Sequence, residues 1–94
     1  MEKHLLRRTT HFAKSYKKVI RNNKKLLSII DEVLRRLSTD PFGTSLRTHK
    51  VKSVLFGEVY SSRVTGDIRI IWIFDQNKKF ILILLEIGGH DEVY

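Results

Sequence analysis

The sequence predicts a single α+β domain, in which two N-terminal antiparallel helices pack on a small, mainly antiparallel twisted sheet. Three observations support this prediction. The chain has 94 residues, which is the size of one compact domain spanning 1–94. Apolar residues recur with the period of a helix in two successive segments of the N-terminal half. The C-terminal half contains three short apolar segments separated by turns, which is typical of an antiparallel meander.

A strand and a helix are the first predicted elements. Residues 4–8 are centred on two leucines, which predicts a short strand, and Thr9-Thr10 after them is a typical helix N-cap. The apolar residues that follow fall on one face of a helix: Phe12, Tyr16, Val19 and Ile20. Asn22-Asn23 interrupts this helix.

The second predicted helix begins after that short turn. Its apolar residues keep the same period: Leu26, Leu27, Ile30, Val33, Leu34 and Leu37. It ends at Asp40-Pro41, because proline disfavours a helical conformation in the residue before it. The short connection makes the two helices neighbours. Neither can bury the apolar stripe of the other alone, so a sheet must cover both.

The predicted strands follow a basic segment. Residues 42–57 contain glycines, serines and several cations, which indicates a basic loop or an irregular entry to a strand. Strands are predicted at 58–64, 68–74 and 80–87, and the polar residues between them form turns. The element order is therefore β-α-α-β-β-β. We expect the large aromatic residues of these strands to pack in the core: Trp72, Phe74 and Phe80.

The composition excludes several functional classes. No cysteine is present, which excludes disulfides, thiolate zinc sites and cysteine catalysis, and fits a reducing cytoplasm. No two histidines have the i, i+3 or i, i+4 spacing that seats a metal ion on a helix, and no glycine-rich phosphate loop occurs. We therefore predict neither a metal nor a cofactor. No apolar run approaches the ~20 residues of a membrane span, so we expect a cytoplasmic protein that does not engage a membrane.

The charge is unevenly distributed along the chain. The net charge is +8. Residues 1–52 contain fourteen Lys and Arg against four Asp and Glu, whereas residues 53–94 contain four against six. Such a cationic half indicates an anionic partner, for which nucleic acid, an anionic membrane surface and an acidic protein are the general candidates. Solvated faces of amphipathic helices are the alternative interpretation.

Several short motifs occur in a characteristic order: Phe12 with Lys17-Lys18, Asp40-Pro41, Tyr60–Val64, Gly66–Ile71 and Ile87–Tyr94. Together they resemble the RelE/ParE superfamily of bacterial toxin–antitoxin modules over nearly the whole chain. The ending is the most specific part, because Gly88-Gly89-His90 is similar to the glycine, threonine, histidine ending of the YafQ-type branch. Asp67 falls in the turn where that branch has a functional aspartate. Arg63 stands where it has a histidine, and cationic residues in that strand are typical of RelE-like members.

The resemblance implies an endoribonuclease that cleaves messenger RNA, in many members while the message occupies the ribosomal A site. Cleavage without a metal needs a base for the ribose 2′-OH, cations around the phosphorane and an acid for the departing 5′-oxygen. His90 is the candidate acid, because an imidazole exchanges protons near neutrality. Arg63 and Arg69 form a phosphate clamp if the register places them on one face, and pairing with a carboxylate is the alternative. His49 or Asp67 is the candidate base, although Asp67 is also an ordinary turn-capping residue.

The candidate RNA-binding residues lie in the basic segment and at the C-terminal end. Arg47, Lys50 and Lys52 would hold the RNA backbone, while an exposed basic loop is the alternative interpretation. Tyr94 would stack on an unpaired base, or is simply a terminal residue.

The resemblance also implies a partner. An acidic, partly disordered antitoxin would bind the cationic surface, fold as it binds and form a toxin–antitoxin hetero-oligomer. Two alternatives remain open from the sequence. One is a ParE-like toxin that acts on DNA gyrase without nuclease activity, and the other is an inactive homologue that retains only antitoxin binding.

Overall fold

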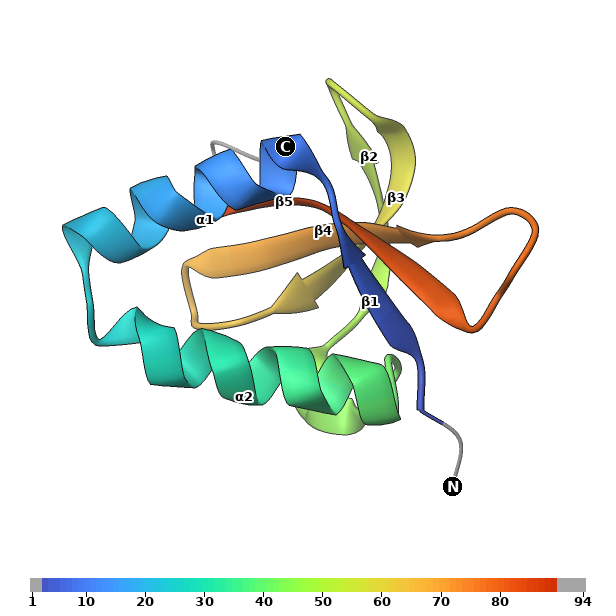
Figure 1. Cartoon of the computed structure of the whole chain (residues 1–94), viewed down its shortest axis with the longest axis horizontal. Coiled ribbons are helices and arrows are strands. Elements are labelled where there is room, and N and C mark those ends of the chain that lie inside the picture. The colour runs from blue at the N-terminus through green and yellow to red at the C-terminus, as the bar shows by residue number, and fades with distance from the viewer. Residues whose placement is uncertain (1–2, 90–94) are drawn as a thin grey trace.

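Two helices cover one face of a five-stranded sheet in the computed structural model, which describes residues 3–89 (Figure 1). The elements follow one another along the chain as β1 (Leu5–Arg8), α1 (Thr10–Asn22), α2 (Leu26–Thr39), the short 3-10 helix η1 (Thr44–Leu46), β2 (His49–Ser53), β3 (Gly57–Arg63), β4 (Ile68–Phe74) and β5 (Ile81–Gly89). The predicted α+β class and the two-layer arrangement are confirmed.

The sheet has the strand order β1-β5-β4-β3-β2. The strands β2 to β5 pair antiparallel as consecutive hairpins, and β1 pairs parallel with β5. The sheet is therefore mainly antiparallel, as predicted. Its two edges are β1 and β2, so the first strand of the chain lies beside the last.

The ends of both helices follow from local side-chain chemistry. The Thr9 hydroxyl accepts a hydrogen bond from the backbone N–H of Phe12 at 3.1 Å and donates one to the carbonyl of Leu84 at 2.8 Å. It therefore caps α1 and ties the start of that helix to β5. Asp40, the residue before the proline, ends α2 in an extended conformation.

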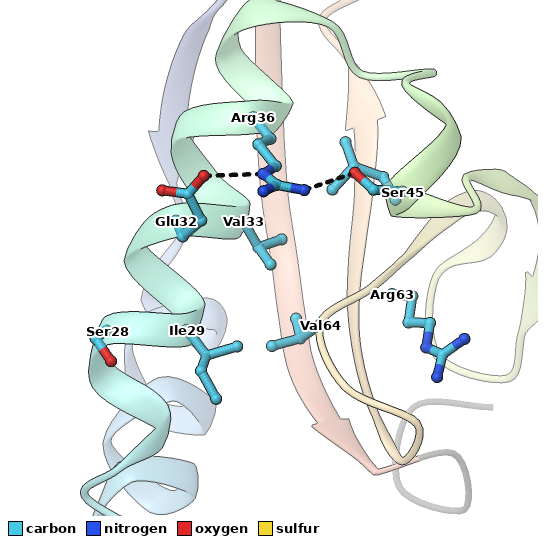
Figure 2. Close-up of a pocket in the computed structure, with 9 residues that line it drawn as sticks. Ser28, Ile29, Glu32, Val33, Arg36, Ser45, Arg63 and Val64 are labelled. Atoms are coloured by element: carbon cyan, nitrogen blue, oxygen red, sulfur yellow. Dashed lines mark hydrogen bonds and ion pairs between the residues drawn. The ribbon is translucent and has the colours of Figure 1, made fainter.

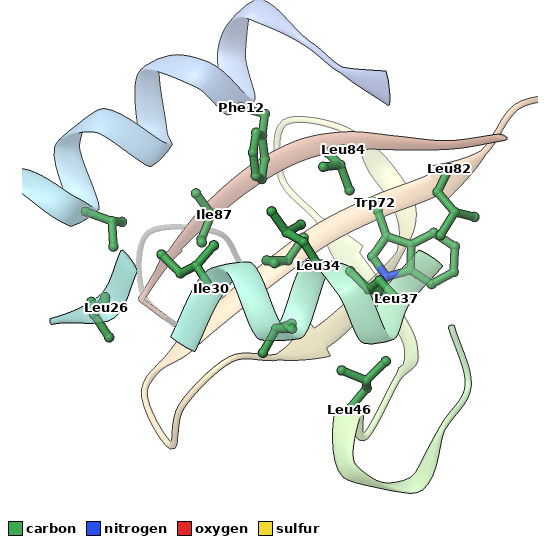
Figure 3. Close-up of a cluster of buried hydrophobic side chains, with 13 residues drawn as sticks. Phe12, Leu26, Ile30, Leu34, Leu37, Leu46, Trp72, Leu82, Leu84 and Ile87 are labelled. Atoms are coloured by element: carbon green, nitrogen blue, oxygen red, sulfur yellow. The ribbon is translucent and has the colours of Figure 1, made fainter. Parts of the chain in front are cut away.

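The main core lies between the helices and the sheet (Figure 3). Trp72 lies on the inner face of the sheet, and the helices contribute Phe12, Ile30 and Leu37, all of which are fully buried. Leu46 of η1 closes the same core from the side.

A second, smaller apolar cluster occupies the opposite face of the sheet, which neither helix covers. Val59, Ile71 and Leu85 are buried there, and four half-buried residues pack around them: Val51, Phe56, Ile73 and Ile83. We call this surface the helix-free face. His49, Arg63 and Arg69 extend this face beyond the apolar cluster, because they alternate in step with Val51, Val59 and Ile71.

Three details differ from the sequence-based expectations. The segment expected to be a basic loop or an irregular strand entry forms η1 and a regular strand, β2. Gly57 has a positive φ of 77° and closes the turn between β2 and β3.

Phe80 is 50% exposed and was wrongly placed in the core, because it lies in the turn just before β5. Leu27 is 40% exposed, since it lies at the edge of the apolar stripe of α2.

In the part of the chain that the structure describes, no helix is both long and apolar enough to cross a membrane.

Two phenylalanines give a matched test of the core. We expect Phe12→Ala to lower the free energy of unfolding by about 3–5 kcal/mol, because Phe12 is fully buried and its removal leaves a cavity. Phe80→Ala removes the same side chain from a half-exposed position and should cost less than about 1 kcal/mol. Urea denaturation of both variants measures the difference. Equal losses would contradict this description of the core.

Candidate functional site

The candidate site lies at one end of the helix-free face, where the strand register gathers basic side chains. His49 of β2 is the direct partner of Ser61 in β3, and Arg63 of β3 is the direct partner of Arg69 in β4. Direct partners in an antiparallel pair share a face, and so do residues two positions apart in one strand. His49, Arg63 and Arg69 therefore lie on the helix-free face.

The register places these three positions as close neighbours. Arg63 and Arg69 are directly opposite each other, so the condition for a phosphate clamp that the sequence left open is met at the level of the backbone. His49 is diagonal to Arg63, and diagonal positions on adjacent strands are about 7–8 Å apart, within reach of long side chains. One imidazole and two guanidinium groups can thus approach one ligand.

Neither arginine is neutralised by a carboxylate among residues 3–89. The Arg69 Nη1 donates to the backbone carbonyl of Thr65 at 2.7 Å, in the turn between β3 and β4. The Arg63 guanidinium packs over the same turn, because its Nη2 is 3.6 Å from the position that a Cβ on Gly66 would take. The alternative in which these arginines pair with Glu58, Glu86 or Asp67 is therefore not realised in the described residues.

Asp67 is exposed in that same turn. The turn is capped by Thr65, whose hydroxyl accepts hydrogen bonds from the backbone N–H groups of Asp67 at 3.2 Å and Ile68 at 3.0 Å. The Asp67 carboxylate makes no hydrogen bond within the described part of the chain. It is therefore not needed to cap the turn that joins the strands of the two arginines.

The lysines of β2 lie on the other side of the sheet. Side chains alternate along a strand, so Lys50 and Lys52 face away from His49. The Lys50 Nζ lies 5.9 Å from the centre of the Tyr60 ring, which belongs to the helix-covered side. Arg47 is exposed just before β2. The predicted RNA-binding cations therefore lie along the β2 edge, and Lys50 and Lys52 do not share a face with His49.

His90 and Tyr94 lie outside the described residues. The last strand ends at Gly89, which pairs with Ile68 at the start of β4. The chain thus leaves β5 beside the turn that contains Asp67.

Sequence reasoning missed a histidine and a glutamate at the adjoining edge of the site. The Nε2 of His11 is 3.5 Å from the Oε1 of Glu86, and the His11 ring contacts Phe56 edge-on. These two residues line a hollow of about 250 Å³ between α1 and β5, together with Lys14 and Lys18. The signal in the sequence was Glu86, a single charged residue in an otherwise apolar strand.

A second hollow, of about 360 Å³, lies between α2 and η1 (Figure 2). Arg36 spans it, donating from Nε to Glu32 and from Nη1 to the Ser45 hydroxyl, each at 2.9 Å. Arg63 and Val64, at the end of β3, also line this hollow. No histidine among residues 3–89 lines the hollow, so we place no chemistry there.

The Glu32 carboxylate has the largest electrostatic perturbation in this region. Hydrogen bonds from Arg35 and then Arg36 lower its pKa from an ordinary value of 4.5 to about 2. The same carboxylate raises the pKa of Arg35. This network fixes the side chains on the exposed surface of α2.

Comparison with known proteins gives a consistent fold. No family model and no curated protein sequence matches the chain significantly. Among solved structures, a metal-bound toxin from Helicobacter pylori has a TM-score of 0.76 and 18% sequence identity, over 97% of this chain and 99% of that one. YafQ in the DinJ–YafQ complex of Escherichia coli has a TM-score of 0.75 and 18% identity, over 97% and 98% of the two chains.

A third structure, the toxin–antitoxin complex RelBE2 from Mycobacterium tuberculosis, has a TM-score of 0.71 and 19% identity over 96% of this chain and 94% of that one. The chain therefore has the fold of the RelE/ParE-type toxins, and the expected fold is confirmed. Residues 3–89 contain no group of three side chains able to hold a metal ion. The absence of a metal requirement stays a prediction.

The two site arginines should differ in their effect on stability. We expect Arg69→Ala to lower the free energy of unfolding by about 0.5–1.5 kcal/mol, because its hydrogen bond to the Thr65 carbonyl is lost. Arg63→Ala should change it by less than about 0.5 kcal/mol, since the Arg63 guanidinium makes no hydrogen bond in the described residues. Urea denaturation of the two variants measures both values, and a larger loss for Arg63→Ala would count against the described turn.

The Glu32 network predicts a pH dependence of stability. A carboxyl group whose folded pKa is lowered from 4.5 to about 2 stabilises the fold above about pH 4.5 and loses that contribution as the pH falls towards 2. The difference in unfolding free energy between the unmodified protein and Glu32→Gln should therefore be constant at neutral pH and shrink through this window. Urea denaturation at a series of pH values tests it. A difference that does not change with pH would refute the assignment.

Proposed function

We propose that this protein is the toxin of a toxin–antitoxin module and that it acts as an endoribonuclease on messenger RNA. The observation that supports the proposal most is the register pair of Arg63 and Arg69, diagonal to His49, on a face that neither helix covers. This arrangement suits a phosphodiester, because two planar guanidinium groups can each donate twice to phosphate oxygens while an imidazole exchanges a proton. The shared fold and the net charge of +8 support the same function.

The proposed reaction needs no metal. A base, His49 or Asp67, removes the proton of the ribose 2′-OH, and the 2′-oxygen attacks the adjacent phosphorus. Arg63 and Arg69 stabilise the negative charge of the phosphorane. The bond from phosphorus to the 5′-oxygen then breaks, and His90 supplies the proton to that oxygen. The products are a 2′,3′-cyclic phosphate and a 5′-hydroxyl.

The proposed partners are an acidic antitoxin and messenger RNA in the ribosomal A site. The structures of DinJ–YafQ and RelBE2 are toxin–antitoxin complexes, which supports an antitoxin for a chain of the same fold. The β2 edge, with Arg47, Lys50 and Lys52, offers a line of positive charge beside the site for the RNA backbone. Part of the cationic surface would also attract an acidic protein.

Two arms test the proposed reaction. In a translating extract we expect the unmodified protein to cut messenger RNA and leave 2′,3′-cyclic phosphate ends, which end-labelling detects. Arg63→Ala should lower the cleavage rate by about 10²–10³-fold, because it removes a cation from the phosphorane. His90→Ala should lose cleavage and toxicity in cells. Lys78→Ala, a charge-matched control in the turn before β5, should keep both.

The same extract separates the competing functions. Running the cleavage reaction in the presence and in the absence of ribosomes shows whether cleavage depends on ribosomes. DNA breaks in the presence of gyrase with intact RNA would indicate a ParE-like toxin, and no effect on either nucleic acid would indicate an inactive homologue. Full toxicity of a folded, well-expressed His90→Ala variant would contradict the assignment of His90.

A further inference from the structure

Arg47, two residues before the candidate base His49, has a left-handed backbone conformation. Its φ is 49° and its ψ is 39°, and it is the one non-glycine residue with a positive φ between residues 3 and 89. Residues with a Cβ seldom adopt this conformation, and they keep it only where the surroundings impose it. Such residues cluster at functional sites.

The neighbours of Arg47 are fixed on both sides. Before it, Leu46 is buried in the main core, and the Arg47 N–H donates to the carbonyl of Thr44 at 3.3 Å. After it, the Thr48 hydroxyl is 2.6 Å from the carbonyl of Pro41 and 2.6 Å from the hydroxyl of Ser62. The backbone between these two anchors has little freedom.

The hydrogen bonds around Thr48 have only one possible direction. A carbonyl only accepts, so Thr48 must donate its single hydroxyl proton to Pro41. Ser62 must then donate to Thr48, and Ser62 in turn accepts from the Nε1–H of buried Trp72 at 2.8 Å. The chain Trp72 to Ser62 to Thr48 to Pro41 therefore ties the segment before β2 to the core. A directed chain of this kind is stiffer than isolated bonds.

The left-handed conformation of Arg47 turns its backbone carbonyl towards the side chain of His49, two residues later. The Nδ1 of His49 is 2.9 Å from the carbonyl oxygen of Arg47. Because the carbonyl cannot donate, Nδ1 must hold a proton when it makes this bond. In the neutral imidazole the other nitrogen, Nε2, then has no proton and presents a lone pair.

We propose that Arg47 is a positioning residue whose left-handed backbone fixes His49 in the Nδ1–H tautomer, so that Nε2 serves as the base for the ribose 2′-OH. This inference rests on the proposed nuclease function and decides between its two candidate bases. The other tautomer, with a proton on Nε2, could only donate at that nitrogen. The exposed His49 would populate that tautomer freely without the Arg47 carbonyl.

Two variants of Arg47 isolate the backbone from the side chain. Arg47→Gly and Arg47→Val both remove the guanidinium group, so any loss of RNA contacts is common to both. Glycine adopts a positive φ without strain, whereas a β-branched residue strongly resists it. The two variants therefore differ in the conformation that presents the carbonyl to His49.

Nitrogen-15 NMR of the histidine rings reads the tautomer directly. At about pH 8, above the ordinary imidazole pKa of ~6.5, we expect the Nδ1–H form to predominate at His49 in the unmodified protein and in Arg47→Gly. Arg47→Val should shift His49 towards the Nε2–H form. His49→Gln assigns the signal. A predominant Nε2–H form in the unmodified protein would overturn the proposal, and this measurement does not depend on how well the valine variant folds.

The cleavage assay supplies the second readout. We expect Arg47→Val to cleave at least about tenfold more slowly than Arg47→Gly, with equal RNA affinity. Equal rates and equal tautomers in the two variants would overturn the positioning role. If the unmodified protein shows the Nδ1–H form but no cleavage, the proposed function fails and the role of the base fails with it. If the unmodified protein cleaves RNA while His49 is in the Nε2–H form, only the inference about Arg47 fails.

Discussion

The pairing register between β3 and β4 is the constraint on which the candidate site depends. It sets Arg63 opposite Arg69 and, through the same strands, Tyr60 opposite Trp72. A shift of one residue in this pairing would place the two arginines on opposite faces of the sheet and bring core side chains of one strand to the surface. The register is held by Trp72, which is fully buried and bonds Ser62 on β3. The core and the site are therefore specified by the same interactions.

The two faces of the sheet have separate roles. The helix-covered face holds the large side chains that stabilise the domain, with Trp72, Tyr60 and Phe74 in mutual contact. The helix-free face has only a small apolar cluster, and the arginines at its polar end pair with no carboxylate among residues 3–89. Because no helix covers that end, a large anionic ligand can approach it without displacing core residues. The chain separates stability from binding by alternating side chains along each strand.

The helices and four of the five strands could be predicted because their signals are local. Thr9 caps the first helix, Asp40 before proline ends the second, and residues 68–74 form a strand that is apolar except for Arg69. The strand β2 could not be predicted in the same way, because Val51 is its only apolar residue and its pairing with β3 provides most of its order. Phe80 was misplaced because apolar character does not distinguish the last turn residue from the strand that follows it.

The candidate site was less predictable than the fold. The residue types were apparent, but whether Arg63 and Arg69 share a face depends on register, which a single sequence does not determine. The capping role of Thr65, which leaves Asp67 without a structural task, and the left-handed Arg47 are products of the folded backbone. The pair of His11 and Glu86 joins residues 75 positions apart, and although Glu86 is the one charged residue of its strand, nothing in the sequence identifies His11 as its partner.

The parallel pairing of β1 with β5 has a consequence for the order of folding. Residues 5–8 align with residues 81–84, so the first strand has no place in the sheet until the last has formed. During synthesis the two helices emerge long before β5, and α1 is tied to that strand through the Thr9 hydroxyl. The domain therefore closes only when its C-terminal strand leaves the ribosome, because loop closure across the whole chain must come last.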